Sequence, residues 1–143
     1  MNIFTWSVTI KRSIPDHPAR PGDPHYKHFI QARKRMLKLG LLKCWICGDT
    51  DNIELHHSLI EYALQNGVDM TKFTELYPEF GEMDDETFKN WIEGEGNLTP
   101  LCRLHHTGDL GIHTLTYPEW LPLRFWKKDI PPPGIRMKKL FKK

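Results

Sequence analysis

Three cysteines and a histidine occur in two short blocks with the spacing of metal ligands. Two residues separate Cys44 from Cys47, and two residues separate Cys102 from His105. This spacing lets both side chains of a pair reach one ion, and three cysteines with one histidine form a common structural zinc site. The set uses every cysteine of the chain. We therefore predict a structural Zn²⁺ ion that joins the two blocks and stabilises a small fold.

Two other interpretations of the cysteines are open. They could be buried side chains that behave as small hydrophobic residues, although the matched spacing of the two blocks favours metal binding. Cys44 and Cys47 could also form a redox-active pair, because the Cys-x-x-Cys motif occurs in thioredoxin-like proteins. The strand–helix–strand pattern expected around such a motif is missing, and a redox role leaves the neighbouring histidines unexplained.

A second group of polar residues remains in the same two blocks. It consists of His56, His57, Asn97, His106 and His113. Residues 53–56 are expected to form a short strand, and successive residues of a strand point to opposite faces. One of His56 and His57 can then bind a metal while the other faces a substrate. His106 directly follows His105, so we expect its side chain to point away from the zinc site.

The two blocks together resemble the HNH family of nucleases. The matching motifs are, in chain order, Cys44-x-x-Cys47-Gly, Leu55-His56-His57 and Asn97-Leu-Thr-Pro-Leu-Cys102-Arg-x-His105-His106. The resemblance covers residues 42–57 and 97–113, which is less than a quarter of the chain. It implies the ββα-metal fold, in which a two-stranded hairpin and a helix hold one divalent ion. It also implies an endonuclease that hydrolyses the phosphodiester bonds of DNA.

The resemblance implies a role for each residue of the second group. His57 resembles the general base, which takes a proton from the attacking water. Asn97 resembles the residue that orients the loop and the base. His56 and His106 resemble ligands of a catalytic divalent ion, which would be Mg²⁺, Mn²⁺, Ni²⁺ or Zn²⁺ and would stabilise the charge that develops at phosphorus.

The third ligand of the catalytic ion departs from the family pattern. Family members usually have it about one helical turn after the second ligand, where this chain has Leu110. Leucine cannot bind a metal, so we expect His113 to take this position after a loop with two glycines. Asp109 is the alternative, but imidazole is favoured because it suits a broad range of divalent ions.

Charge is distributed unevenly along the chain. Residues 1–43 contain nine Lys/Arg and two Asp/Glu, residues 44–95 contain two and thirteen, and residues 96–143 contain nine and three. Basic ends favour a polyanionic partner, and we expect DNA to be held through its phosphates with weak sequence preference. The residues expected to bind nucleic acid include Arg33, Lys34, Arg103, Lys127 and Lys128. Ordinary solvated surface charges are the alternative interpretation.

The length of 143 residues favours one domain, which we expect to be of the α+β class. A strand and a basic helix are expected in residues 1–41. Residues 42–57 and 97–116 would form the ββα-metal core, stapled by the structural zinc. We expect residues 58–96 to form an acidic helical insertion and residues 117–143 to form a basic C-terminal extension.

Four elements outside the core are expected from local patterns. Alternating apolar residues predict a strand at 2–10, and an apolar stripe predicts a helix at 25–39. Two helices are expected in the insertion, at 59–66 and at 84–93, the second with Asp84 as its N-cap. The acidic insertion would repel DNA, so we place it away from the catalytic groove, where a protein partner could contact it.

The sequence also bears on the compartment. Its apolar runs are too short for a transmembrane helix, and its N-terminus lacks the pattern of a secretory signal. With three cysteines, a disulfide framework is not expected. We therefore expect a cytoplasmic protein of a bacterium or a phage-infected host cell, with no membrane partner.

One function of a different class competes with the nuclease. The chain could be a catalytically inactive, zinc-stabilised module that keeps an HNH-like fold and binds nucleic acid or protein. Such a module has no need for a base beside a metal ligand. The presence of His57 next to His56 therefore favours the enzyme.

Overall fold

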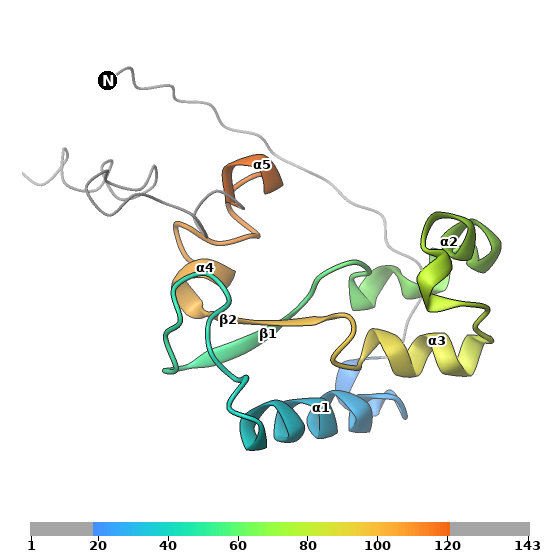
Figure 1. Cartoon of the computed structure of the whole chain (residues 1–143), viewed down its shortest axis with the longest axis horizontal. Helices are drawn as coiled ribbons and strands as arrows, with labels where there is room; N and C mark the ends of the chain where they lie inside the picture. The colour runs from blue at the N-terminus through green and yellow to red at the C-terminus, as the bar shows by residue number, and fades with distance from the viewer. Residues whose placement is uncertain (1–18, 121–143) are drawn as a thin grey trace, which may run out of the picture.

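The structure is a computed structural model that describes residues 19–120, apart from the side chains of residues 118 and 119. This part of the chain is an α+β unit with one two-stranded antiparallel sheet surrounded by short helices (Figure 1). The strand predicted at 2–10 lies outside the described residues, and so do Lys127, Lys128 and most of the C-terminal extension. The helices and strands are α1 (Tyr26–Lys38), β1 (Ile53–His57), α2 (Met70–Leu76), α3 (Asp85–Ile92), β2 (Leu98–Cys102), α4 (Arg103–His106) and α5 (Tyr117–Trp120). Three 3₁₀-helices join them: η1 (Arg20–Gly22), η2 (Tyr62–Gly67) and η3 (Pro78–Phe80).

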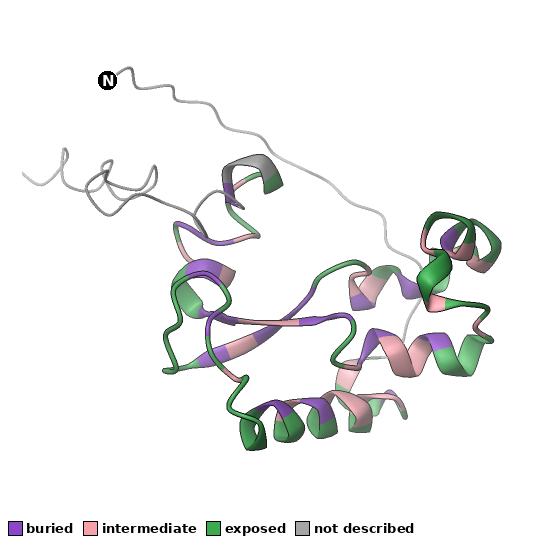
Figure 2. Ribbon diagram, in the orientation of Figure 1, coloured by how far each residue is buried: buried purple, intermediate pink, exposed green. Residues whose placement is uncertain are grey.

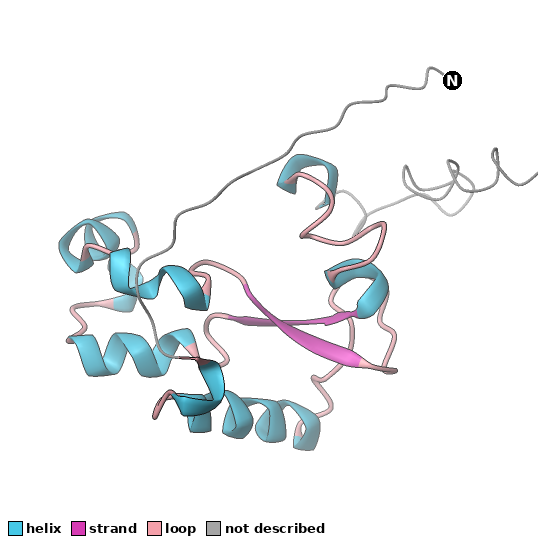
Figure 3. Ribbon diagram, turned by 180° about the vertical axis from the view of Figure 1, so that it is seen from behind, coloured by secondary structure: helices cyan, strands magenta, loops and turns pink. Residues whose placement is uncertain are grey.

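The two strands pair over their full length. The register places Ile53 opposite Cys102 and His57 opposite Leu98. Because side chains alternate along a strand, Glu54 and His56 share one face of β1, whereas Leu55 and His57 share the other. The strands cross the middle of the unit when it is seen from behind (Figure 3).

Helix α1 covers the face of the sheet that carries Leu55. Its buried residues Ala32 and Met36 pack against Leu55 and Leu98. Figure 2 shows this buried side of α1 turned toward the strands, with its outer side exposed. The helix predicted at 25–39 is therefore confirmed, and its amphipathic pattern has the packing expected of it.

The opposite face of the sheet meets α4. Helix α4 begins directly after β2 and contacts both strands. Beside it lies an apolar cluster that joins the turn before β1, both strands, the loop after α4 and α5. Its buried members are Cys44, Ile46, Ile53, Leu101, Cys102, Leu110 and Trp120. The sheet is thus held between α1 on one side and α4 on the other (Figure 1). Strand β1 ends with the adjacent residues His56 and His57.

The insertion between the strands has a small core of its own. Phe73, Phe88 and Ile92 are buried together there. Helix α3 begins after Asp84, whose carboxylate accepts a hydrogen bond from the Thr87 N–H, so the predicted helix and its cap are confirmed.

Two details of the insertion differ from the prediction. Residues 59–66 do not form an α-helix, because the Asn97 side chain binds the backbone N–H groups of Leu59 and Ile60 and holds this segment in an irregular conformation. The second half of this range forms the 3₁₀-helix η2 instead. Helix α2 was not expected, although Asp69 caps it by accepting hydrogen bonds from two backbone N–H groups.

Within residues 19–120, no helix combines the length and the apolar character that crossing a membrane requires.

Candidate metal centre

Cys44, Cys47, Cys102 and His105 come together as one group, called here the four-ligand cluster. Their ligand atoms all lie within 4.8 Å of one another. The Sγ atoms of Cys47 and Cys102 are 3.8 Å apart, and tetrahedral zinc with bonds of about 2.3 Å places two sulfurs roughly 3.8 Å from each other. All three cysteines are free thiols rather than disulfides. The cluster can therefore bind a metal ion such as zinc.

Local backbone geometry positions the first two ligands. The segment from Cys44 to Gly48 turns sharply, with the Gly48 N–H donating to the Cys44 carbonyl at 2.8 Å. Gly48 has φ +78°, a left-handed conformation that glycine adopts without strain. The Trp45 N–H donates to the Pro100 carbonyl of β2 at 2.9 Å, which fastens the turn to the sheet.

The other two ligands come from the junction of β2 and α4. Cys102 is the last residue of the strand and precedes the first residue of α4, so His105 follows about one turn later. His105 Nδ1 lies 3.2 Å from the Cys102 Sγ and 3.6 Å from the Cys44 Sγ. The His105 carbonyl accepts a hydrogen bond from Trp120 Nε1 at 3.0 Å, and this contact holds the start of the C-terminal segment against α4.

The thiols of the four-ligand cluster perturb one another. Burial opposes the ionisation of Cys44, but hydrogen bonds from His105 and from nearby backbone N–H groups bring its pKa down to about 6. Burial, and then the neighbouring Cys44 thiolate, raise the pKa of Cys47 to about 12. Several thiolates at one point repel each other, and a divalent cation between them removes that repulsion.

His56, His106 and His113 form a second group, called here the three-histidine cluster. Their ligand atoms also lie within 4.8 Å of one another. The Nε2 atoms of His106 and His113 are 3.2 Å apart, and the ring centroids of His56 and His113 are 4.9 Å apart. His56 is buried while His113 is exposed, so the cluster opens to solvent on one side. Three nitrogen donors with an open side leave coordination positions for other ligands.

His56 is kept neutral by its surroundings. Burial, and then the charges of His113, His106 and His57, lower its pKa to about 4. A histidine must be neutral to bind a metal. His56 is therefore in its metal-binding form throughout the physiological pH range.

The loop after α4 brings His113 to the cluster. The N–H groups of Ile112 and His113 donate to the carbonyls of His105 and His106, at 3.1 and 3.3 Å. The loop passes so close to α4 that a Cβ on Gly111 would lie 2.5 Å from the His106 carbonyl oxygen.

The structure places both Leu110, which stands at the family's usual position of the third ligand, and the alternative ligand Asp109 outside the three-histidine cluster. Leu110 is buried in the apolar cluster beside α4, as expected of a side chain that cannot bind a metal. Asp109 is exposed and is not part of the group. The geometry thus agrees with His113 and not with Asp109.

Glu54 belongs to the same site, although it was not among the predicted site residues. Its Oε2 lies 2.5 Å from His106 Nδ1. It precedes His56 by two residues on β1, so the two side chains share one face. This alternation was the signal in the sequence that could have identified it.

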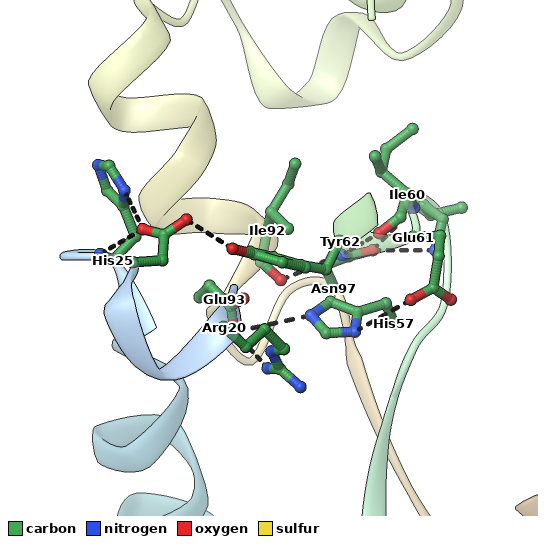
Figure 4. Close-up of polar contacts among 11 residues, drawn as sticks. Arg20, His25, His57, Ile60, Glu61, Tyr62, Ile92, Glu93 and Asn97 are labelled. Carbon is green, nitrogen blue, oxygen red and sulfur yellow. Dashed lines mark hydrogen bonds and ion pairs between the residues drawn. The ribbon is translucent and has the colours of Figure 1, made fainter. Parts of the chain in front are cut away.

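His57 lies apart from the three-histidine cluster. Its ring faces α1 and stacks on Phe29, with 6.2 Å between centroids. Its two ring nitrogens are turned toward carboxylates, with Nδ1 3.9 Å from Glu61 and Nε2 3.6 Å from Glu93 (Figure 4). Glu93 is fully buried and pairs with Arg20 at 2.8 Å. The role of His57 as a general base stays a prediction.

Asn97 ties the ends of the insertion to each other. It is fully buried, and its amide donates to the carbonyls of Ile60 and Ile92 at 2.8 and 3.1 Å. Its Oδ1 accepts hydrogen bonds from the backbone N–H groups of Leu59 and Ile60, at 2.9 and 3.1 Å. These four contacts use the whole hydrogen-bonding capacity of the side chain. Asn97 thus fixes the path of the chain just after His57.

The basic residues expected to bind DNA differ in their surroundings. Arg33 is half-buried and donates to the Ile53 carbonyl at 2.8 Å, so part of its guanidinium serves the fold. Lys34 and Arg103 are exposed. Arg103 is the first residue of α4, next to the Cys102 ligand.

No protein-family model, curated protein or solved structure matches the chain. Its described residues form a small α+β unit in which two Cys/His clusters adjoin the same short helix, and each cluster can hold a metal ion.

Proposed function

We propose that the chain is a metal-dependent endonuclease of the HNH type, which hydrolyses phosphodiester bonds in DNA. The observation that carries the proposal is the three-histidine cluster, which lies between β1 and α4 and opens to solvent. The paired strands, the following helix and the adjoining four-ligand cluster support an HNH core. The order of the motifs in the sequence supports it independently.

The donor chemistry of the three-histidine cluster fits a divalent ion. Three imidazole nitrogens suit Zn²⁺ or Ni²⁺ better than Mg²⁺, which prefers oxygen ligands. When bound, such an ion would stabilise the negative charge that develops on a phosphate oxygen during hydrolysis. His56, His106 and His113 would hold it without adding negative charge, so the site would attract phosphate.

We assign the general base to His57, whose surroundings differ from those of an exposed base. A base must present a ring nitrogen to water, whereas both nitrogens of His57 face carboxylates of the insertion. His57 remains our assignment because it follows His56 directly, as in the HNH motif. Asn97 would act by fixing the segment that carries His57.

Charge supports DNA as the substrate. Lys34 and Arg103 are exposed on the described part of the chain, and residues 96–143 contain nine Lys/Arg against three Asp/Glu. Phosphate contacts of this kind position DNA without reading its sequence. Most acidic residues lie in the insertion, which leaves that part of the chain to a protein partner.

The test is cleavage of supercoiled plasmid by the zinc-loaded full chain with Mn²⁺, Ni²⁺, Zn²⁺ or Mg²⁺. We expect nicked or linear product with at least one of the first three ions, and its loss in His113→Ala. His28→Ala is the matched control, because His28 lies on α1 outside both clusters. Plasmid that stays supercoiled with every ion, or equal cleavage by His113→Ala, would contradict the proposal.

The inactive binding module is the second candidate, and the burial of His57 favours it. A side chain enclosed by Phe29, Glu61 and Glu93 is placed to stabilise the fold. This candidate predicts salt-dependent DNA binding in gel-shift assays without cleavage under any ionic condition.

A further inference from the structure

We propose that Glu54 is a positioning residue of the three-histidine cluster. Its carboxylate fixes the His106 ring so that Nε2, and not Nδ1, faces the metal position. The inference rests on the proposed function only in taking this cluster to bind a divalent ion.

The contacts on the two edges of the His106 ring define its orientation. On one edge, Nδ1 lies 2.5 Å from the Glu54 Oε2. On the other edge, Nε2 lies 3.2 Å from the His113 Nε2, inside the group of metal-ligating atoms. In a neutral imidazole one nitrogen carries the proton and the other has the free lone pair. A carboxylate at Nδ1 accepts that proton, which leaves the lone pair of Nε2 for the metal.

The position of Glu54 in the sheet fixes the geometry of this contact. Glu54 lies within β1, two residues before His56, and it is paired with Leu101 of β2. The backbone on both sides of its Cα is therefore held by the sheet, and the same strand supplies a ligand and the residue that orients another ligand. His106 lies on α4, which contacts β1.

Glu54 is not itself a ligand of the cluster. The group of converging ligand atoms consists of the three histidines alone. The Glu54 oxygen binds the far edge of the His106 ring. A carboxylate in this place raises the basicity of the imidazole and prevents the ring from turning over, and loss of such a partner typically weakens metal binding by about 10- to 100-fold.

The exposure of the two side chains makes the idea testable without disrupting the core. The Glu54 side chain is 44% exposed, whereas that of His106 is 15% exposed. Replacing Glu54 therefore removes the carboxylate without opening a buried cavity. Asp51 gives a charge-matched control, because it is an exposed acid in the turn before β1.

The experiment compares metal affinities of full-length protein with zinc already in the four-ligand cluster. Co²⁺ is titrated into the wild type, Glu54→Ala, Glu54→Gln and Asp51→Ala, and binding is followed by calorimetry and by the visible absorption of Co²⁺. We expect Glu54→Ala to bind Co²⁺ about 10- to 100-fold more weakly. Glu54→Gln should recover part of the affinity, because its amide oxygen still accepts the Nδ1 proton, and Asp51→Ala should match the wild type.

A second measurement reports the orientation without any metal in the cluster. In ¹⁵N NMR spectra of the wild type, His106 should carry its proton on Nδ1, and Glu54→Ala should shift it toward Nε2. Equal Co²⁺ affinities and equal His106 spectra in the wild type and Glu54→Ala overturn the inference alone. A wild-type chain that takes up no second ion overturns the proposed function as well.

Discussion

The two Cys/His clusters adjoin the same short helix but differ in their access to solvent. Three of the four ligands of the four-ligand cluster are buried, whereas the three-histidine cluster has one buried, one half-buried and one exposed ligand. His105 and His106 are neighbours in the sequence, and each belongs to a different cluster. Adjacent positions on one turn of helix thus separate a closed site from an open one.

The charges of the two sites differ as well. A Zn²⁺ ion with three thiolates and a neutral histidine has a net charge of about −1, whereas a divalent ion with three neutral histidines keeps its full charge of about +2. With these ions bound, the first site would repel an anion and the second would attract one. The comparison teaches that the donor atoms, more than the position in the fold, decide the charge of each site.

The largest effect should follow from removing a ligand of the four-ligand cluster. Cys44→Ser removes a fully buried ligand, and metal binding at structural zinc sites is worth on the order of 10 kcal/mol of folding free energy. We expect the variant to lose both its zinc and its folded state, as measured by elemental analysis and circular dichroism. His113→Ala should stay folded with its zinc bound. Folded, zinc-free Cys44→Ser protein would show that the closed site is not structural.

The next effect separates the roles of His57 on β1 and His106 on α4. We expect His57→Gln to lower the cleavage rate by about 10²-fold, the usual contribution of a general base, at every ion concentration. His106→Ala should instead lower the affinity for the second ion, so a higher concentration of that ion should restore part of the rate. Plasmid cleavage measured against ion concentration checks both. Full activity of His57→Gln would remove the base assignment.

A smaller effect should come from changing the loop after α4, which brings His113 to the three-histidine cluster. Gly111→Ala places a Cβ 2.5 Å from the His106 carbonyl oxygen, so the loop has to move and His113 with it. Overpacking of this kind costs roughly 1–3 kcal/mol. We expect weaker binding of the second ion by calorimetry with an unchanged zinc content.

Gly22→Ala provides the matched control for the loop, because no atom lies within 4 Å of the Cβ that this substitution would add. If Gly111→Ala binds the second ion as tightly as Gly22→Ala, the close approach of the loop to α4 does not position His113.

The smallest effect concerns a titrating group remote from both clusters. Burial lowers the pKa of His25, but hydrogen bonds to Glu86 and Asp23, at 2.9 and 2.7 Å, outweigh it and raise the pKa above 6.5. A raised pKa means that the folded state holds the proton more tightly than the unfolded chain does. The added stability is therefore complete below about pH 6.5 and is lost as the pH rises through the folded-state pKa.

Thermal unfolding of the zinc-loaded protein at several pH values measures this contribution. We expect the midpoint to fall by a few degrees as the pH rises through the folded-state pKa of His25. His25→Gln should flatten that dependence without changing the zinc content. An unchanged pH dependence in His25→Gln would show that another titrating group causes the effect.

Spacing was sufficient to predict the four-ligand cluster, because it restricts which side chains can converge on one ion, whereas the three-histidine cluster was expected from the resemblance to the HNH family. The Cys-x-x-Cys motif and the Cys-x-x-His motif each act over one turn, and the strand over residues 53–56 fixes which face His56 occupies. The helix at 25–39 and the Asp84 cap are local features as well. Predictions of this kind succeed because they depend on short stretches of chain.

The features that the sequence did not predict depend on contacts between distant residues. Glu93 is buried against Arg20, which lies 73 positions earlier, and no local pattern marks a glutamate for burial. The conformation of residues 59–61 depends on Asn97, nearly forty positions later. His57 likewise faces α1 and the insertion rather than the open cluster, because those elements fold against its side of the sheet.

The two strands of the sheet are separated by the whole insertion, and this connection has a kinetic consequence. The connection begins at Ser58, directly after β1, and ends at Asn97, directly before β2. These two ends are neighbours, since the Ser58 N–H donates to the Asn97 carbonyl at 2.8 Å. The entropy lost on closing such a loop grows only with the logarithm of its length, so the insertion lowers the stability of the sheet little. Pairing between strands so far apart is slow, however, because few local contacts favour it before the loop has closed. The small core around Phe73 can form from nearby residues first and shorten the distance that the strands must still close.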